Sequence, residues 1–372
     1  MKAIVPLYTT CLVLLVLLNL QAGAQSSFVH PGILHTDDAF TLMQDNIKTK
    51  KQPAYGSYEQ LRRSRYAKSD YRLEGPKKVI GRGHYGSSSR DDFKATYHNA
   101  LMWKLTGDEA HAEKAMEILE AYAATLEKVD FKADGPLLVG LQGFLFVNGA
   151  EIMRSYRGMT PTKLKNIQSM FKKVFIPVCI EFFEKEPFSN GNWGASVLKG
   201  CLGYAIFTDD HGLYRRVAKL CLEGEDNGSL KYYIDGETGQ NQEAGRDQQH
   251  SQLGVACLAE AAEVAHSQGH DLYGALNNRI LKGFEYLAKH NLNERVPYKV
   301  WSDLTGKYDG WKKISEPGRL GNIYAMAYNH YVLRKGLKMP YTKQAVEKIQ
   351  PEREGIYADH PGFGSLLFLG VK

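Results

Sequence analysis

Apolar residues recur every three or four positions along most of the chain, and few segments alternate between apolar and polar residues. The first pattern is typical of amphipathic helices and the second of half-buried strands, so the sequence predicts an all-α protein. Short Gly-, Asp- and Thr-containing segments at 106–108, 208–212 and 268–270 separate several of the helices. The expected helices cover residues 91–105, 108–126, 142–156, 161–184, 195–207, 211–222, 245–267, 272–290 and 323–335.

Many helix pairs joined by short turns favour an (α/α) toroid or incomplete barrel of antiparallel pairs, with a central substrate cleft or tunnel. No sequence repeat of fixed period is present that would favour a binding solenoid. Hydrophobic residues make up 43% of the chain, enough for a large core, and no low-complexity linker divides it. We therefore expect one main domain.

The N-terminus has the composition of a secretory signal. Met1 and Lys2 precede an apolar run, and Ala22-Gly-Ala24 supplies a small-x-small cleavage pattern. A membrane anchor is the alternative, but this run is short for a span, and no later segment looks apolar and long enough to cross a bilayer. The sequence thus predicts a signal peptide over 1–24 and a single catalytic barrel domain over 25–372, exported to the periplasm or the extracellular space.

Charge and cysteine content narrow the possible partners. The formal net charge of +6 falls to +5 without Lys2, a mild excess that suits an acidic substrate, and no Lys/Arg run with interleaved aromatics indicates nucleic-acid binding. The remaining cysteines are widely spaced with no C-x-x-C pair, so we expect no zinc site, no other metal and no cofactor. Disulfides and buried free thiols both remain open, as does the oligomeric state. These cysteines are Cys179, Cys201, Cys221 and Cys257.

The segment 243–250 combines an acid, a guanidinium and an imidazole. In a helix, Glu243, Arg246, Asp247 and His250 would share one face, since residues three, four and seven apart do so. Such a face suits chemistry on an anionic substrate. The structural alternative is a buried ion-pair network that braces two helices.

Two further clusters carry suitable groups. Asn192 and Trp193 combine an amide donor with a flat aromatic surface, although Asn and Gly also make ordinary turns. Tyr298 lies close in sequence to Arg295 and Lys299, and nearby cations lower the pKa of a phenol. The alternative for Tyr298 is a loop tyrosine with a solvent-facing hydroxyl.

Residues 81–86 contain G-x-G-x-x-G, a pattern found in dinucleotide-binding sites. We reject that interpretation because no convincing βαβ context or ribose-binding acid accompanies it. A substrate-contacting loop that includes His84 and Arg90, or a mobile surface loop, fits its small and basic residues better.

The three clusters supply what β-elimination of a uronic-acid polymer requires. Removing the C5 proton places charge on the adjacent carboxylate, which Asn192 and Arg246 could stabilise. A base must take that proton and an acid must protonate the departing O4, and His250 and Tyr298 have suitable chemistry.

Longer motifs then indicate a family. The segment Gly245-Arg-Asp-Gln-Gln-His250-Ser-Gln-Leu-Gly254, together with His30-Pro-Gly-Ile-Leu-His-Thr36 and Tyr328-Asn-His-Tyr331, resembles the alginate lyase superfamily, and more narrowly polysaccharide lyase family 38. The resemblance implies an (α/α) barrel that cleaves 1,4-linked uronans.

The resemblance also implies individual roles. It matches Asn192 to the neutralising asparagine, His250 to the histidine of the Arg-Asp-x-x-His motif and Tyr298 to the catalytic tyrosine. Tyr324 and Tyr328 compete for the last role, and Trp193 stands where better-known relatives have histidine, which leaves the division between base and acid open. The candidate catalytic residues are Asn192, Arg246, His250 and Tyr298, and the candidate substrate-binding residues are His84, Arg90, Trp193, Glu243, Gln249, Arg295 and Arg319.

Alginate is the first expected substrate and glucuronan the second. Guluronate is the C5 epimer of mannuronate, so a site with His250 and Tyr298 on opposite sides of the sugar would accept both. Tyr298 acting alone would favour mannuronate or glucuronan. The competing functions are a non-catalytic uronan-binding protein and a glycoside hydrolase, for which Glu243 and Asp247 lie too close together to flank a bond.

Overall fold

The computed structural model describes residues 27–83, 86–185, 191–225, 228–355 and 359–372, and the predicted signal peptide 1–24 lies outside them. The regular secondary structure of the described chain is helical, apart from two two-residue strands that pair in parallel. Its elements are α2 (Asp37–Lys48), α3 (Ala54–Arg63), η1 (Arg65–Ala67), β1 (Val79–Ile80), α4 (Gly86–Thr106), α5 (Glu109–Thr125), β2 (Lys128–Val129), α6 (Gly135–Gly140), α7 (Gln142–Met153), α8 (Pro161–Met170), η2 (Phe171–Phe175), α9 (Ile176–Glu184), α10 (Gly191–Phe207), α11 (His211–Glu223), α12 (Leu230–Tyr233), α13 (Gln248–Ser267), α14 (Ala275–Asn291), α15 (Tyr324–Tyr328), η3 (Asn329–Arg334), α16 (Pro340–Ile349) and α17 (Gly364–Leu367).

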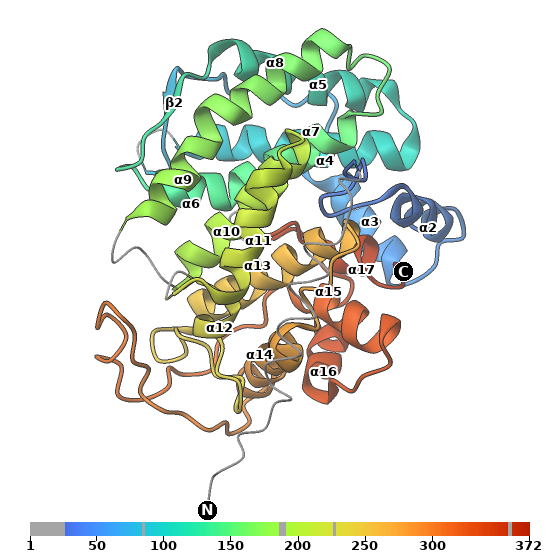
Figure 1. Cartoon of the computed structure of the whole chain (residues 1–372). Helices are drawn as coiled ribbons and strands as arrows, with labels where there is room; N and C mark the ends of the chain where they lie inside the picture. The colour runs from blue at the N-terminus through green and yellow to red at the C-terminus, as the bar shows by residue number, and fades with distance from the viewer. Residues whose placement is uncertain (1–26, 84–85, 186–190, 226–227, 356–358) are drawn as a thin grey trace, which may run out of the picture.

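The helices form an inner and an outer layer (Figure 1). The inner helices α4, α7, α10 and α13 contact one another in that order. The outer helices α5, α11 and α14 pack against α4, α10 and α13, while α8 packs against α5, and α9 against α6 and α10. Every residue of α7 is buried, and so is every residue of α10 except Trp193. A helix that is apolar on all sides belongs inside a protein. The predicted toroid of antiparallel helix pairs is therefore confirmed.

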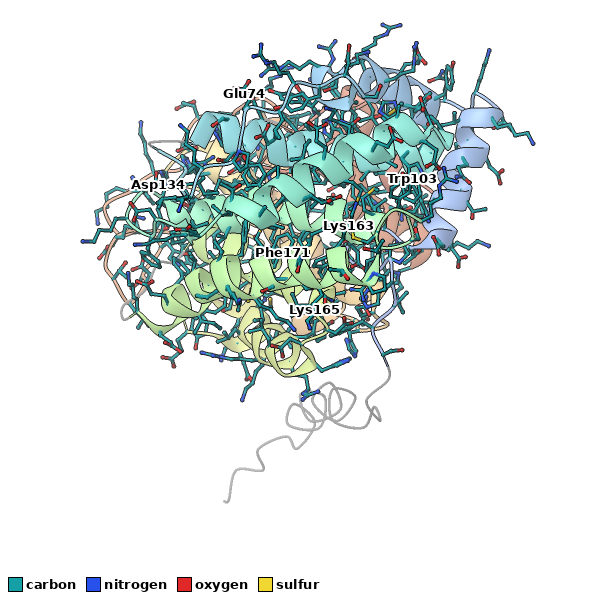
Figure 2. All side chains as sticks on the ribbon, turned by 90° about the horizontal axis from the view of Figure 1, so that it is seen from above. Glu74, Trp103, Asp134, Lys163, Lys165 and Phe171 are labelled. Carbon is teal, nitrogen blue, oxygen red and sulfur yellow. The ribbon has the colours of Figure 1, made fainter. Side chains whose placement is uncertain are left out.

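Outer helices bury only one face. At the end of α8 the chain passes into η2, where Phe171 is fully buried, while Lys165 one turn and a half earlier is exposed (Figure 2). Thr160 caps α8 by accepting the backbone N–H of Lys163, and Pro161 follows at the first helical position. The capping residues and the single buried face explain why the sequence shows a clear helical periodicity in this segment.

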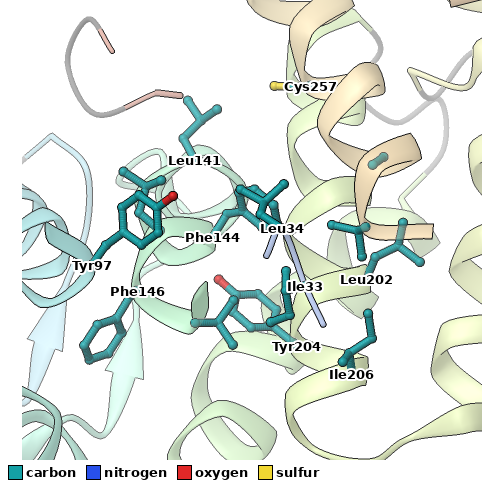
Figure 3. Packing of buried hydrophobic residues seen from close by; sticks show 14 of the residues in the cluster. Ile33, Leu34, Tyr97, Leu141, Phe144, Phe146, Leu202, Tyr204, Ile206 and Cys257 are labelled. Carbon is teal, nitrogen blue, oxygen red and sulfur yellow. The ribbon is translucent and has the colours of Figure 1, made fainter. Parts of the chain in front are cut away.

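The core fills the space between the inner helices. Tyr97 of α4 and Phe146 of α7 lie on one side of Tyr204 of α10, and Ile33 and Leu34 of the N-terminal segment lie on the other side, toward Leu202 (Figure 3). Tyr97, Phe146, Tyr204 and Ile33 are fully buried. The core thus joins the chain's beginning to its middle and holds α10 and α13 in fixed positions.

All nine expected helices exist, but two are interrupted and two begin three residues later than expected, one of them α14, which begins at Ala275 instead of Leu272. The helix expected at 161–184 contains the π-helix η2, and that expected at 323–335 continues from α15 into the π-helix η3. The helix expected to begin at Gly245 begins at Gln248, because Asp247 is its N-cap. The sequence analysis missed six short or terminal helices, namely α2, α3, α6, α12, α16 and α17.

Two expectations about composition can be compared with the structure. Contrary to the sequence analysis, one further segment, Gly135–Met153, is long and apolar enough to cross a membrane, but it is entirely buried inside the protein as α6 and α7. The four cysteines within the described ranges are buried free thiols, so the disulfide alternative does not apply to them.

Candidate active site

The turn that precedes α13 (residues 241–247) is organised around one carboxylate. Glu243 is fully buried, and its oxygens accept four hydrogen bonds. The backbone and side-chain amides of Asn192 donate at 2.9 and 2.8 Å, the Tyr233 hydroxyl at 2.9 Å and the Arg246 guanidinium at 3.0 Å. Glu243 therefore positions Asn192 and Arg246. The prediction that Glu243 binds substrate directly does not agree with this burial.

The structural alternative raised for segment 243–250 thus applies in part to Glu243 and Arg246, which form an ion pair whose carboxylate is buried. The four charged residues do not share a helix face as expected, because Glu243 and Arg246 lie in the turn and only His250 lies in α13. Contacts between residues three apart nevertheless persist, since a tight turn brings them together as a helix does. Arg246 remains partly exposed, with 29% of its side-chain surface accessible, so it can meet a ligand.

Asp247 holds His250 in place. Its Oδ1 accepts the backbone N–H of His250 at 2.8 Å, which caps α13, and its Oδ2 lies 2.7 Å from Nδ1 of the ring. Burial raises the pKa of Asp247, but the hydrogen bonds from the side chain and backbone of His250 outweigh it and keep the pKa below its usual value. An ionised Asp247 accepts Nδ1–H, which leaves a lone pair on Nε2.

Tyr298 also contacts this turn. Its hydroxyl donates to the backbone carbonyl of Trp311 at 2.5 Å and lies against Gly245, where a Cβ would be 2.3 Å from the phenol oxygen. The prediction that nearby cations lower the pKa of Tyr298 is wrong, because burial raises it. The ammonium of Lys299 instead pairs with Asp235 at 2.6 Å.

A loop without helix or strand (loop 292–323) carries Tyr298 and covers the turn (orange in Figure 1). The backbone N–H and the hydroxyl of Ser315 both donate to the carbonyl of Ala244, at 3.0 and 3.1 Å. At its start, Lys299 exchanges two hydrogen bonds with the side chain of Gln240, at 2.7 and 2.9 Å. A backbone carbonyl of the turn and the side chain of Gln240 just before it thus hold this loop in position.

A cavity of about 600 Å³ opens beside the N-terminus of α13. Asp247, Gln249 and Arg319 contribute to its walls, so the structure brings two of the predicted substrate-binding residues together there. Asp359 and His360, from the segment before α17, form part of the facing wall. The sequence analysis missed both residues, although adjacent acid and imidazole groups near the C-terminus could have indicated them.

The other predicted residues have different surroundings. Trp193 is half-buried against the core, Arg90 is half-buried in the first turns of α4, and Arg295 is exposed on loop 292–323. His84 lies outside the described residues. The predicted contacts of these four side chains with substrate stay predictions.

The competing tyrosines lie in the C-terminal helices. Tyr324 is fully buried, its hydroxyl donates to Gln252 at 3.0 Å, and burial raises its pKa. Tyr328 is partly buried against the core, and the His330 ring of the same motif stacks on Tyr273 with centroids 3.9 Å apart. This geometry favours a structural role for the motif 328–331.

Solved structures share this fold. An alginate lyase from Bacteroides ovatus is 14% identical, with 91% of this chain and 99% of that chain covered and a TM-score of 0.58. Alginate lyase A1-III from Sphingomonas species A1 is also 14% identical, with 91% and 97% covered and a TM-score of 0.64. A variant of A1-III complexed with a tetrasaccharide is 14% identical, with 90% and 96% covered and a TM-score of 0.63. No curated protein sequence matched the chain.

The helical toroid and the match to a family model define the class of protein as a polysaccharide lyase, a carbon–oxygen lyase. The sequence model of the alginate lyase family matches residues 44–296, more than half of the chain. The chain belongs to the alginate lyase family.

Proposed function

We propose that the protein cleaves 1,4-linked uronic-acid polymers by β-elimination at the turn before α13, with alginate as the first substrate and glucuronan as the second. One observation carries this assignment of the site. A single buried carboxylate, Glu243, holds both Asn192 and Arg246, and the next residue to Arg246, Asp247, orients His250. Groups that stabilise an anion therefore lie next to a group that can take a proton.

Asn192 and Arg246 are the proposed neutralising residues. When the C5 proton leaves, negative charge develops on the sugar carboxylate, and preorganised N–H donors stabilise it best. Glu243 offsets the charge of Arg246, so the stabilisation comes from directed N–H groups rather than from an excess of positive charge. Each side chain has further N–H donors besides the one bound to Glu243.

His250 is the proposed base and Tyr298 the proposed acid. The contact with Asp247 leaves Nε2 of His250 with a lone pair, which a base needs. Burial raises the pKa of Tyr298, so its hydroxyl keeps a proton that it can give to the departing O4. The Trp311 carbonyl holds this hydroxyl beside Gly245 until substrate replaces that contact. The C5 protons of the two alginate epimers lie on opposite faces of the sugar, so cleavage of both would require His250 and Tyr298 to exchange the roles of base and acid.

The two carboxylates at the site argue against glycoside hydrolysis. A hydrolase needs one carboxyl group that keeps a proton to donate. Glu243 already accepts four hydrogen bonds, and the pKa of Asp247 lies below its usual value. A purely binding protein would have no use for an imidazole oriented by a carboxylate.

Three finer assignments accompany this proposal. The chain is a member of the polysaccharide lyase family 38 branch, and it is exported as a single domain over 25–372 after removal of 1–24. Gln249 and Arg319 in the cavity wall bind sugar units next to the one that reacts, because an amide and a guanidinium suit hydroxyl and carboxylate groups. Trp193, Arg90, Arg295 and His84 are candidates for more distant contacts.

The test is the ultraviolet absorbance of unsaturated sugar ends during incubation with polymannuronate, polyguluronate and glucuronan in parallel. A rise with polymannuronate or polyguluronate that exceeds the rise with glucuronan is expected. His250→Gln should abolish it, and Asn192→Ala should lower kcat more than it weakens binding. A mature protein that binds these polymers but forms no unsaturated ends would overturn the proposal.

A further inference from the structure

A second carboxylate–imidazole pair lies in the wall of the cavity, apart from Asp247 and His250. Nδ1 of His360 is 2.5 Å from Oε1 of Glu260, which α13 supplies from the protein interior. Glu260 is only 2% exposed, and His360 is 8% exposed. The ring is therefore held at one nitrogen by a buried anion.

The surrounding charges are already balanced without the imidazole. Lys199 of α10 is fully buried, donates to the other oxygen of Glu260, and also donates to the backbone carbonyl of Asp359 at 3.0 Å. The carboxylate of Asp359 accepts from Arg82 at 3.0 Å and from Gln142 at 2.9 Å. Two carboxylates thus face two permanent cations, so Glu260 does not require His360 as its counter-charge.

The geometry leaves one edge of the ring for a ligand. Nδ1 points to Glu260 in the interior, and Nε2 lies on the opposite side of the imidazole. No hydrogen bond reaches Nε2 from the residues that the structure describes. His360 belongs to the wall of the cavity of about 600 Å³, together with Asp247, Gln249 and Arg319. Cavities of this size hold ligands larger than one sugar ring.

We propose that His360 binds substrate: its Nε2 contacts a uronate unit that occupies this cavity beside the reacting sugar, while Glu260 and Lys199 position the ring. This inference rests on the proposed lyase function and extends it to a binding subsite. A charge-neutral setting with one free imidazole edge suits a sugar that presents both hydroxyl and carboxylate groups, because imidazole can accept a hydrogen bond or, once protonated, donate one.

Two substitutions separate binding by Nε2 from support of Glu260. In His360→Asn, the amide nitrogen can take the place of Nδ1 and keep the bond to Glu260, but nothing reaches the cavity. In His360→Gln, the longer amide can take the place of Nε2. We expect His360→Asn to raise KM for polymannuronate about tenfold with kcat nearly unchanged, and His360→Gln to raise KM less than about threefold, since one hydrogen bond is lost or kept.

The control is His330→Gln. His330 is also a buried histidine, and the ion pair of Arg334 with Glu263 of α13 lies beside it. Its ring, however, stacks on Tyr273. Its replacement should lower thermal stability and leave KM unchanged.

The outcomes are distinct. Unchanged KM in His360→Asn, or a larger rise in His360→Gln than in His360→Asn, would assign His360 to structure alone. If the wild-type protein forms no unsaturated ends with any uronan, the proposed function fails instead. A variant that does not fold is recognised by circular dichroism, and the other amide variant then decides the question by its KM relative to wild type.

Discussion

Asp247 contacts His250 twice, once at the backbone and once at the ring, through different oxygens of the same carboxylate. The first contact begins helix α13 and the second fixes the orientation and tautomer of the imidazole. A residue that starts a helix thus also prepares the proposed base. Folding of this helix end and the chemistry of the site are therefore coupled at one side chain.

Asp247→Asn should separate the two contacts. Asparagine caps helices about as well as aspartate, so the free energy of unfolding should change by less than about 1 kcal/mol. Its amide cannot accept Nδ1–H while its oxygen caps the helix, so the proton moves to Nε2 and the base is lost. We expect kcat to fall about 10²–10⁴-fold. Asp247→Ala, which removes both contacts, should lose stability as well, and an active Asp247→Asn enzyme would contradict the assignment of His250.

Gly245→Ala should displace Tyr298 without touching its chemistry. A Cβ at this position would lie 2.3 Å from the phenol oxygen and 2.6 Å from Cβ of Trp311, so one of them must move. A misplacement of about 1 Å can cost about 10²-fold in rate, and we expect kcat to fall by about that factor. Gly310→Ala is the matched control, because no atom lies within 4 Å of a Cβ there. Equal kcat values for the Gly245→Ala and Gly310→Ala variants would mean that the Tyr298 hydroxyl takes no part in the reaction.

Tyr298→Phe should lower kcat about 10²–10⁴-fold if the hydroxyl is the acid. Removal of its hydrogen bond to Trp311 should cost only about 1 kcal/mol of stability. Tyr286→Phe serves for comparison, since the Tyr286 hydroxyl also donates to a backbone carbonyl of this loop, that of Pro297 at 2.8 Å. Steady-state kinetics of both variants should show a loss for Tyr298→Phe alone, and similar kcat values would remove Tyr298 from the mechanism.

Glu352 should make stability depend on pH. Burial raises its pKa from 4.5 to about 7, and hydrogen bonds from Ser365 only partly oppose this. The unfolded chain loses this proton as pH rises past 4.5, whereas the folded chain keeps it until about pH 7. Stability from this residue is thus complete below pH 4.5 and falls by about 3 kcal/mol as pH rises to 7.

Urea unfolding of wild type and Glu352→Gln across this range measures the effect. The glutamine mimics the protonated acid, so the two proteins should be similar at low pH and the variant should be more stable above pH 7. Parallel pH curves would mean that Glu352 ionises normally in the folded state.

Sequence periodicity predicted the nine main helices because each spans several turns and carries apolar residues at helical spacing. It placed the start of α13 three residues early, since Gly245, Arg246 and Asp247 continue the polar pattern of the helix, and only the backbone conformation identifies Asp247 as the cap. Short helices such as α12 and α17 lack enough turns to show a period.

The candidate site was predictable only where neighbours in sequence are also neighbours in space. The contacts of Arg246 with Glu243 and of His250 with Asp247 span three residues, so the motif alone suggested them. The burial of Glu243 depends on Asn192, 51 residues away, and the environment of His360 depends on Glu260, 100 residues away. A local sequence pattern cannot reveal contacts between residues so far apart in the chain, because tertiary packing brings them together.

The two proposed proton-transfer groups lie on segments that differ in stability, because Tyr298 belongs to loop 292–323 and His250 to a helix. His250 sits on a helix packed in the inner layer, whereas Tyr298 depends on hydrogen bonds such as those of Ser315 to Ala244 and of Lys299 to Gln240. Segments held by few contacts open at a smaller free-energy cost than the core. Warming would therefore move Tyr298 away from His250 while the helical toroid stays folded. The enzyme would lose activity below its melting temperature and regain it on cooling.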